Sequence, residues 1–345
     1  MVALGRSAYD GLQEDLANAP PEHLAAIANQ SYGQVILHSA FQNVPALAKA
    51  IPQDLAIYFA EMQRANQDRN QKAIAQLQEI AAILHPYEIP VIALKGAADL
   101  LDPLHSIPAH RYISDLDLLV PADKATQAAR LLRQAKGLPT EDHLIRPGNH
   151  HHLTQITHPD WTFTVELHIA PGSTAVSAVL NADDMIENAV PTDIRGASIP
   201  CREDRFLHHI LHGMELRHET ANLNLRLLAD QVGYLEILPE QILNQALFRL
   251  NPSDCADWMT DLSLLARGLM GSAELSPFGW PARALQVFGN PEAARSQDNA
   301  FWIRHYLRRM IQNADYRRQT LRKVVSPKAW AEFIAFHKDR RSKFK

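Results

Sequence analysis

The first 86 residues repeat apolar positions at the spacing of helices. Prolines and Gly33 separate short segments rich in Ala, Gln, Leu and Glu. A polar stretch at residues 64–71 interrupts the longest segment, and we expect it to be exposed. Apolar residues recur at roughly helical intervals before and after that stretch: Leu55, Phe59, Met62, Ile74, Leu77, Ile80, Ala81 and Leu84. This region carries no recognisable chemistry and is expected to cover one face of the domain that follows.

The pattern changes to strands after residue 86. Residues 91–94 form a short apolar run, and Lys95 and Gly96 make a turn into a helical pattern over residues 97–104. A second strand is predicted over residues 115–120, with Leu116, Leu118 and Val120 packing on one side of it.

Two further elements complete this middle region. Residues 122–136 predict an amphipathic helix with Gly137 as its stop. Residues 151–158 and 162–169 predict a hairpin, and the second arm alternates cleanly. Phe163, Val165, Leu167 and Ile169 then share one face.

From about residue 199 onward the chain again has helical patterns, and no run approaches the ~20 apolar residues of a membrane helix. The pattern therefore predicts an α+β protein with three regions. These are an N-terminal helical region over 1–86, a strand-containing core over 87–198 and a C-terminal helical region over 199–345.

The strand at residues 115–120 carries two acids on one face. Asp115 and Asp117 are two residues apart, so their side chains project in the same direction. Burying two carboxylates side by side without a partner is costly. Mg²⁺ prefers such oxygen ligands, and the pair therefore indicates a metal-dependent site for phosphate chemistry.

A third acid lies on the alternating strand at residues 162–169. Glu166 shares a face with Thr164 and His168. An acid in the middle of a strand belongs either to a solvated face or to a functional one. The aspartate pair upstream favours the functional interpretation. His168 is a candidate to bind a carboxylate or a phosphate, and a structural role is the alternative.

Three further positions are candidate phosphate ligands. Lys95 and Gly96 lie between a strand and a helix, where a cation and a closely approaching backbone can hold an anion. A simple turn is the alternative. Arg111 lies four residues before Asp115 and is expected either to contact a triphosphate or to brace the carboxylates, unless it is exposed. Ser114 directly precedes the pair.

The charge and the cysteine content say less about function than the acidic strand residues do. Residues 301–345 contain thirteen Lys or Arg and three acids, a net charge of +10, against -14 for the remainder. Such a tail can attract RNA or nucleotides, but we favour the solvated face of terminal helices, because no aromatic-rich binding motif is interleaved with the charge. Two isolated cysteines and the absence of a signal-like N-terminus predict a cytoplasmic protein.

His208 and His212 have the i, i+4 spacing of zinc ligands, but the Glu of an HExxH motif is missing.

These motifs together resemble a known family. The order LKG, R-x3-D-x-D-L-L-V, helix and V-E-L-H is similar to the bacterial nucleotidyltransferase-like family within the polymerase-beta-type nucleotidyltransferase superfamily. The similarity covers about residues 75–235 and includes a histidine-rich helix and the L-R-L-L-A-D segment at 225–230. One departure is Lys95-Gly96-Ala97, where many members of the wider superfamily have Gly-Ser.

The resemblance implies a small mixed sheet flanked by helices. It implies that Asp115, Asp117 and Glu166 are the catalytic carboxylates and hold two Mg²⁺ ions, with Mn²⁺ as a substitute. Glu166 is the candidate for deprotonating the acceptor. The expected reaction moves a nucleoside monophosphate from an NTP such as ATP to a hydroxyl or phosphate of a small molecule, peptide, protein or RNA. The alternative is a non-catalytic module that retains the fold and binds a nucleotide or a protein.

Overall fold

The protein is described here from a computed structural model. The structure describes residues 13–14, 16–30, 32–105, 107–141, 145, 151–220 and 225–250. All of these belong to the first of two compact units, Met1–Ala284, and the second is Leu285–Lys345. The basic segment at residues 301–345 lies outside the described residues. None of the helices described is both long and apolar enough to cross a membrane.

The N-terminal region is helical, as its pattern predicts. The short helices α2, α3 and α4 pack on the first turns of the long helix α5 through a small apolar cluster that includes Phe41 and Phe59. The helices are α2 (Pro21–Gln30), α3 (Leu37–Asn43), α4 (Pro45–Ala48) and α5 (Gln53–Leu84), followed by the 3-10 turn η1 (His85–Tyr87).

Helix α5 continues without a break through the polar stretch at residues 64–71, which the sequence predicts to be exposed. Two of its residues are buried instead. Asn66 and Asn70 each donate a hydrogen bond to the carbonyl oxygen of Arg111, at 3.0 and 2.9 Å. Their amides satisfy backbone carbonyls that would otherwise be buried without partners. The prediction is therefore wrong at these two positions, because the polar residues fasten α5 to the loop before the second strand.

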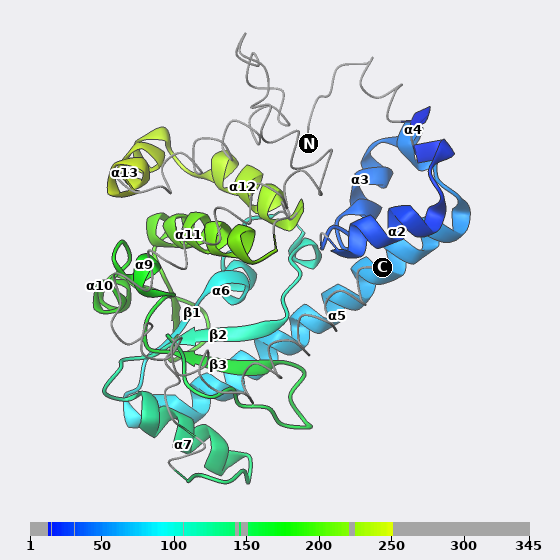
Figure 1. Cartoon of the computed structure of the whole chain (residues 1–345). Coiled ribbons are helices and arrows are strands. Elements are labelled where there is room, and N and C mark those ends of the chain that lie inside the picture. Colours follow the sequence, from blue (N-terminus) through cyan, green and yellow to red (C-terminus); the bar gives the residue numbers. More distant parts are fainter. Residues whose placement is uncertain are drawn as a thin grey trace, which may run out of the picture. The chain divides into compact units, whose positions relative to one another are not determined.

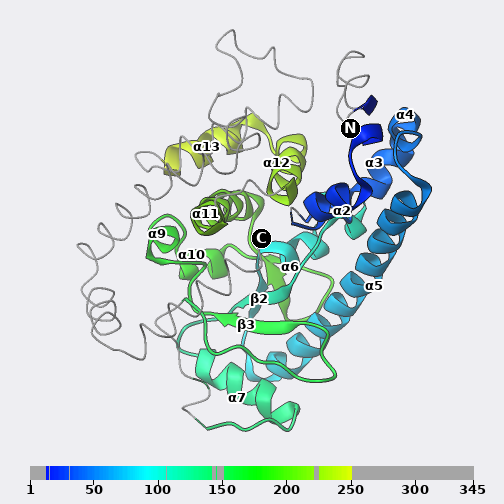
Figure 2. The ribbon, with the colours of Figure 1, turned by 45° about the vertical axis from the view of Figure 1, so that its right-hand side comes forward.

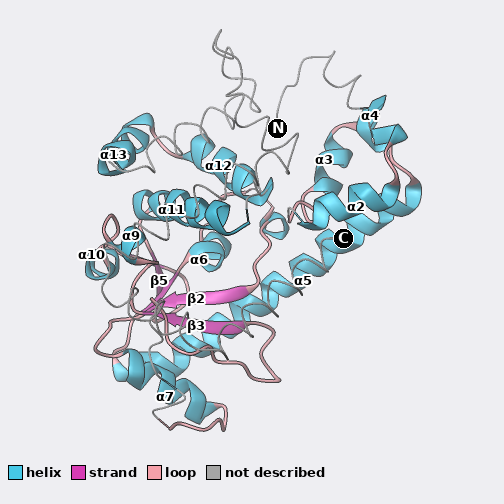
Figure 3. Ribbon diagram, viewed as in Figure 1, coloured by secondary structure: helices cyan, strands magenta, loops and turns pink. Residues whose placement is uncertain are grey.

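A five-stranded mixed sheet forms the core of the first unit, in the order β3-β2-β1-β5-β4. Strand β2 pairs in parallel with β3 and antiparallel with β1, while β5 pairs in parallel with β1 and antiparallel with β4. Figure 3 shows β2 and β3 side by side among the helices. The strands are β1 (Val91–Ala93), β2 (Asp115–Leu119), β3 (Thr164–His168), β4 (Val190–Pro191) and β5 (Ala197–Ile199).

Helices cover both faces of the sheet, as Figure 1 and Figure 2 show from two directions. Leu116, Leu118 and Val165 pack with α5 and α7 in one apolar cluster. Ile92 and Leu119 lie on the opposite face of the sheet, where they pack with helices that come after β3 in the chain. The remaining helices are α6 (Lys95–Leu101), η2 (Pro108–His110), α7 (Ala125–Ala135), α9 (Thr174–Ser177), α10 (Ala182–Glu187), α11 (Arg202–Thr220), α12 (Leu225–Ile237) and α13 (Glu240–Leu250).

The structure confirms the predicted α+β class and most of the predicted elements. The exception is the first arm of the hairpin at residues 151–158. It lies antiparallel to β3 but forms only two isolated bridges, His152 with His168 and Ile156 with Val165. The arm is therefore an edge segment with intermittent pairing, although the rings of His152 and His168 still lie close, with centroids 5.4 Å apart.

Candidate functional site

The parallel pairing of β2 and β3 brings the predicted acids together. Asp117 is the direct partner of Glu166, and Asp115 is the partner of Thr164. Leu116 and Val165 occupy the intervening positions and point into the apolar core. Because side chains alternate along a strand, the three acids lie on the face opposite that core. The predicted orientation of both strands is confirmed.

Asp117 is the most enclosed of these carboxylates, with its side chain 7% exposed. Its Oδ1 atom accepts a hydrogen bond from Lys95 Nζ at 3.0 Å and lies 2.7 Å from His168 Nε2. Burial alone would raise the pKa of Asp117, but the Lys95 ammonium and His168 offset it and hold that pKa far below its usual range. Asp117 is therefore ionised at neutral pH.

Glu166 lies between two imidazoles and an amide. Gln155 donates a short hydrogen bond to its Oε1, and its Oε2 lies 3.7 Å from His168 Nε2 and 3.8 Å from His152 Nε2. The nearby His168 imidazole is the main reason why the pKa of Glu166 is lowered, and the hydrogen bond from Gln155 acts in the same direction. The carboxylate is consequently held both ionised and in a fixed orientation.

Asp115 has a different environment at the beginning of β2. Its Oδ1 accepts a hydrogen bond from the Ser114 hydroxyl at 2.9 Å. Burial, and then the negative charge of Asp117, raise the pKa of Asp115. The two aspartates of the D-x-D pair thus differ in basicity, and a cation placed between them would favour the ionised form of both. Contact of Ser114 with a phosphate stays a prediction.

Lys95 is the first residue of α6 and has an unusual backbone conformation. Its φ is 49°, in the left-handed region, where a residue other than glycine costs about 1–3 kcal/mol. The side chain is directed at Asp117, and the three acids of the site offset the burial and raise the pKa of Lys95. The ammonium of Lys95 is thus partly buried and held at Asp117, and binding of a phosphate by Lys95 stays a prediction.

Gly96 is required by packing. A Cβ atom at this position would overlap the Cγ2 atom of the buried Ile113 and would lie 3.4 Å from Arg111 Nε. The missing side chain is therefore explained by the close approach of the loop that leads into β2. Binding of phosphate by the backbone of Gly96 stays a prediction.

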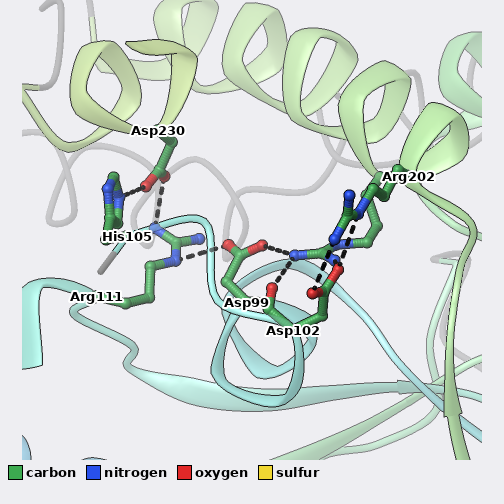
Figure 4. A network of polar contacts seen from close by, with 7 residues as sticks. Asp99, Asp102, His105, Arg111, Arg202 and Asp230 are labelled. Atoms are coloured by element: carbon green, nitrogen blue, oxygen red, sulfur yellow. Dashed lines mark hydrogen bonds and ion pairs between the residues drawn. The ribbon is translucent and has the colours of Figure 1, made fainter. Parts of the chain in front are cut away.

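Arg111 takes part in a buried ion-pair network (Figure 4), and in the part of the chain that the structure describes its ion pairs go neither to Asp115 nor to Asp117. Its Nε lies 2.9 Å from Asp99 Oδ2 on α6, and its Nη1 donates to Asp230 Oδ2 on α12 at 2.7 Å. The sequence offers three interpretations of Arg111: contact with a triphosphate, bracing of the D-x-D carboxylates, or an exposed position in the loop. Within the described residues its ion pairs go to Asp99 and Asp230 instead, and contact with a triphosphate stays a prediction.

The same network continues along α6 and into α11. Arg205 binds Asp99 at 2.9 Å and also contacts Asp102, while the more exposed Arg202 contacts Asp102 at 3.3 Å. On the other side, His105 lies 3.1 Å from Asp230. These contacts join helix α6, which begins with Lys95, to both α11 and α12.

A small polar cavity of about 30 Å³ lies between α6, α11 and α12. That volume is sufficient for a water molecule. Lys95 and Arg111 line it, together with His208 and His212 of α11. Burial lowers the pKa of His208 to about 3, so its ring is neutral. These two histidines do not belong to the metal-type cluster found among the described residues, which forms at the sheet.

That cluster consists of Asp117, Glu166 and His168. One ligand atom from each residue lies within 4.8 Å of the others, so all three can reach one ion. Two carboxylates and an imidazole are suitable donors for a divalent cation. The residues present therefore fit a metal, although His168 occupies a place in the cluster where the sequence predicts Asp115.

Two neighbours of Glu166 were not among the predicted site residues. His152 and Gln155 come from the edge segment at residues 151–158. The hairpin pattern contained the necessary signal for His152, because the segment was predicted to pair with the strand that carries Glu166 and His168. Asp99 lies on α6, and nothing in the sequence singled it out. Asp230 ends the L-R-L-L-A-D segment of the resemblance, but the sequence does not specify its pairing with Arg111, which is 119 residues away.

A mixed sheet with clustered acids on two adjacent strands and helices on both faces is the architecture expected of a nucleotidyltransferase. Comparison with known protein families agrees. A family described as uncharacterised nucleotidyltransferase matches residues 18–271, which is most of the chain. The protein belongs to that family. No curated protein and no solved structure matches the chain.

Proposed function

We propose that the protein transfers a nucleoside monophosphate from an NTP to a hydroxyl or phosphate acceptor, with Mg²⁺ as the cofactor. The observation that supports this best is the register of the sheet. It places Asp117 opposite Glu166, with Asp115 two residues away on the same face. Three carboxylates assembled from two strands are a suitable site for divalent ions and a triphosphate.

Each residue has an assigned role in this proposal. Asp115, Asp117 and Glu166 would hold the metal, which when bound would neutralise charge on the triphosphate. Lys95 supplies a positive charge directly beside Asp117 and holds a phosphate oxygen, with Gly96 and Ser114 nearby. Most of the rate enhancement then comes from positioning and from fixed charges.

Glu166 is the residue that we assign to the acceptor. Its neighbours Gln155 and His168 keep it ionised and fix the direction of its carboxylate. An ionised carboxylate within reach of an acceptor hydroxyl can take its proton as the oxygen attacks the α-phosphate. Pyrophosphate leaves, and the nucleoside monophosphate remains on the acceptor.

The test compares three Asp→Asn variants of the full chain. Asp115→Asn and Asp117→Asn remove charge from the site, whereas Asp123→Asn changes an exposed residue just beyond β2. Each protein is incubated with labelled NTPs and Mg²⁺ in a lysate, and mass spectrometry identifies molecules that gain a nucleotide. We expect a loss of at least about a hundredfold in the first two variants, since each carboxylate supports several kcal/mol of charge stabilisation.

Transfer at the wild-type rate in both site variants would refute the proposal. Calorimetry with ATP and Mg²⁺ addresses the non-catalytic alternative. Binding without turnover of any NTP, for every acceptor offered, would favour a module that retains the fold and has lost the reaction.

A further inference from the structure

Tyr32, shortly after helix α2, packs on two residues that come from elements around the candidate site. Its ring stacks on that of Tyr112, with centroids 5.1 Å apart and planes inclined by 21°. The Arg226 guanidinium lies over the Tyr32 ring, 5.1 Å from its centroid. Tyr112 belongs to the loop that leads into β2, and Arg226 belongs to α12. Aromatic rings and guanidinium planes are the groups on which proteins stack nucleobases.

Tyr112 is held in place by the core of the protein. The Arg69 guanidinium of α5 lies 5.0 Å from the ring centroids of both Tyr112 and Phe163, and Phe163 is buried. The carbonyl oxygen of the preceding residue, Arg111, accepts hydrogen bonds from two buried asparagines of the same helix. The Tyr112 ring is therefore a pre-formed platform that does not depend on Tyr32.

Tyr32, in contrast, has an unfavourable backbone conformation. Its φ is 54°, in the left-handed region that glycine usually supplies after the end of a helix. Gly33 lies one residue later, and its N–H donates to the carbonyl oxygen of Ala28 at 2.8 Å. Tyr32 is also 37% exposed. Helices α2, α3 and α4 are held to α5 by an apolar cluster of their own, so the Tyr32 ring can leave the stack without opening the clusters around the sheet.

The stack lies within reach of the acidic site. Tyr112 precedes Asp115 by three residues, so their Cα atoms are at most about 11 Å apart. Arg226 lines the same cavity as Lys95, whose ammonium contacts Asp117. Figure 1 and Figure 2 show the end of α2 beside α12 and the loop that leads into β2. A nucleotide with its phosphates at Lys95 and the acids can therefore extend its base to the stack.

We propose that Tyr112 and Arg226 form the binding site for the base of the NTP, and that Tyr32 competes with the base for this position. The proposal rests on the proposed function for the presence of an NTP, and it adds the base-binding residues and an autoinhibitory contact. Tyr32 shows that the position accepts a planar ring, and its partial exposure leaves room for a larger purine to extend toward solvent. The base enters only when the Tyr32 ring leaves, which lowers the apparent affinity for the nucleotide.

The experiment measures binding to the full chain by calorimetry, with Mg²⁺ and without an acceptor. ATP, GTP, CTP and UTP are each compared with tripolyphosphate, so that the ratio of dissociation constants isolates the contribution of the nucleoside. Tyr32→Gly removes the competing ring and suits the left-handed backbone, so the fold should be retained. We expect this variant to bind at least one NTP at least about fivefold more tightly, with tripolyphosphate binding unchanged.

Substitutions of Tyr112 identify the platform. In the Tyr32→Gly background, Tyr112→Leu should weaken NTP binding at least about fivefold relative to tripolyphosphate, because it removes the aromatic face. Tyr112→Phe keeps that face and should bind NTP as before. Tyr87→Gly is the matched control, since Tyr87 is also a partly exposed tyrosine but follows the opposite end of α5. Its affinity for each NTP should equal that of the wild type.

The results separate this proposal from the proposed function. Wild-type affinity of Tyr32→Gly for all four NTPs, or a gain that Tyr112→Leu leaves intact, would overturn the base site even if nucleotide transfer is observed. A gain in Tyr32→Gly that Tyr112→Leu removes would support the base site even if no acceptor is modified, and in that case only the proposed function fails.

Discussion

Replacing Arg111 by Met tests whether this residue holds the fold together or serves the site. Its guanidinium is buried between Asp99 and Asp230, with contacts of 2.9 and 2.7 Å. Met retains most of the apolar stem and removes the charge, leaving two buried carboxylates that have lost their shared partner. Breaking a buried ion pair in this way costs about 3–5 kcal/mol. Arg205 still contacts Asp99, so the lower half of this range is expected.

The matched control is Arg64→Met. Arg64 binds Glu61 at 2.6 Å, which is a shorter contact than either of those made by Arg111, but the two side chains are 67% and 58% exposed. Exposed pairs of this kind contribute little to stability, because water and salt screen the two charges. Urea denaturation of the full chain, followed by circular dichroism, gives the midpoint and slope for each variant. We therefore expect the larger loss of stability in Arg111→Met, although the ion-pair contacts of Arg111 are longer than that of Arg64.

A second substitution in the same network tests whether the lost stability comes from the carboxylates that Arg111 contacts. Asp230→Asn in the Arg111→Met background removes one of the two carboxylates that have lost Arg111, so we expect it to recover at least about 1 kcal/mol. If Arg111 instead acts mainly on a triphosphate, Arg111→Met will leave the urea midpoint unchanged and reduce only nucleotide transfer. That outcome would refute the structural role given to the network.

Two other predictions concern α6 and α11. Gly96→Ala should destabilise the protein by about 1–3 kcal/mol through overlap with Ile113, and thermal unfolding that matches the wild type would contradict the packing described. His208 has a pKa of about 3 in the folded protein and about 6.5 when unfolded. Below pH 6.5 the unfolded chain therefore binds a proton that the folded chain does not, and stability should fall by up to about 1.4 kcal/mol per pH unit. His208→Gln should reduce that slope in urea titrations between pH 6.5 and 4, and equal slopes would show that the ring is already charged.

The strand pattern was enough to predict the acidic part of the site. Alternation along residues 115–120 and 162–169 identifies the faces of Asp117 and Glu166, and the structure confirms both faces. The helical regions on either side were also recognisable, because long amphipathic segments have a strong periodic signal. These features depend on local spacing, which a single sequence contains.

Contacts between distant segments were not accessible in this way. The partners of Arg111 come from α6 and α12, and spacing along the chain does not specify which carboxylates meet a given arginine. Asn66 and Asn70 are a second example. Their polar stretch is expected to face solvent, but both side chains are buried and donate hydrogen bonds to the carbonyl oxygen of Arg111, which is distant in sequence. Gly96 was interpreted through phosphate chemistry, whereas Ile113 explains why it is a glycine.

The pairing of β2 with β3 also determines which changes in chain length this protein can tolerate. The segment between α7 and β3 can gain or lose residues without moving Glu166 only where residues 151–158 keep their contacts with β3 and β3 enters the sheet in the same register. One residue inserted within β3 before Glu166 would instead turn that carboxylate toward the apolar core and a neighbouring hydrophobic side chain toward Asp117. Length variation among related chains should therefore gather in the connecting segment and be excluded from the five residues of the strand.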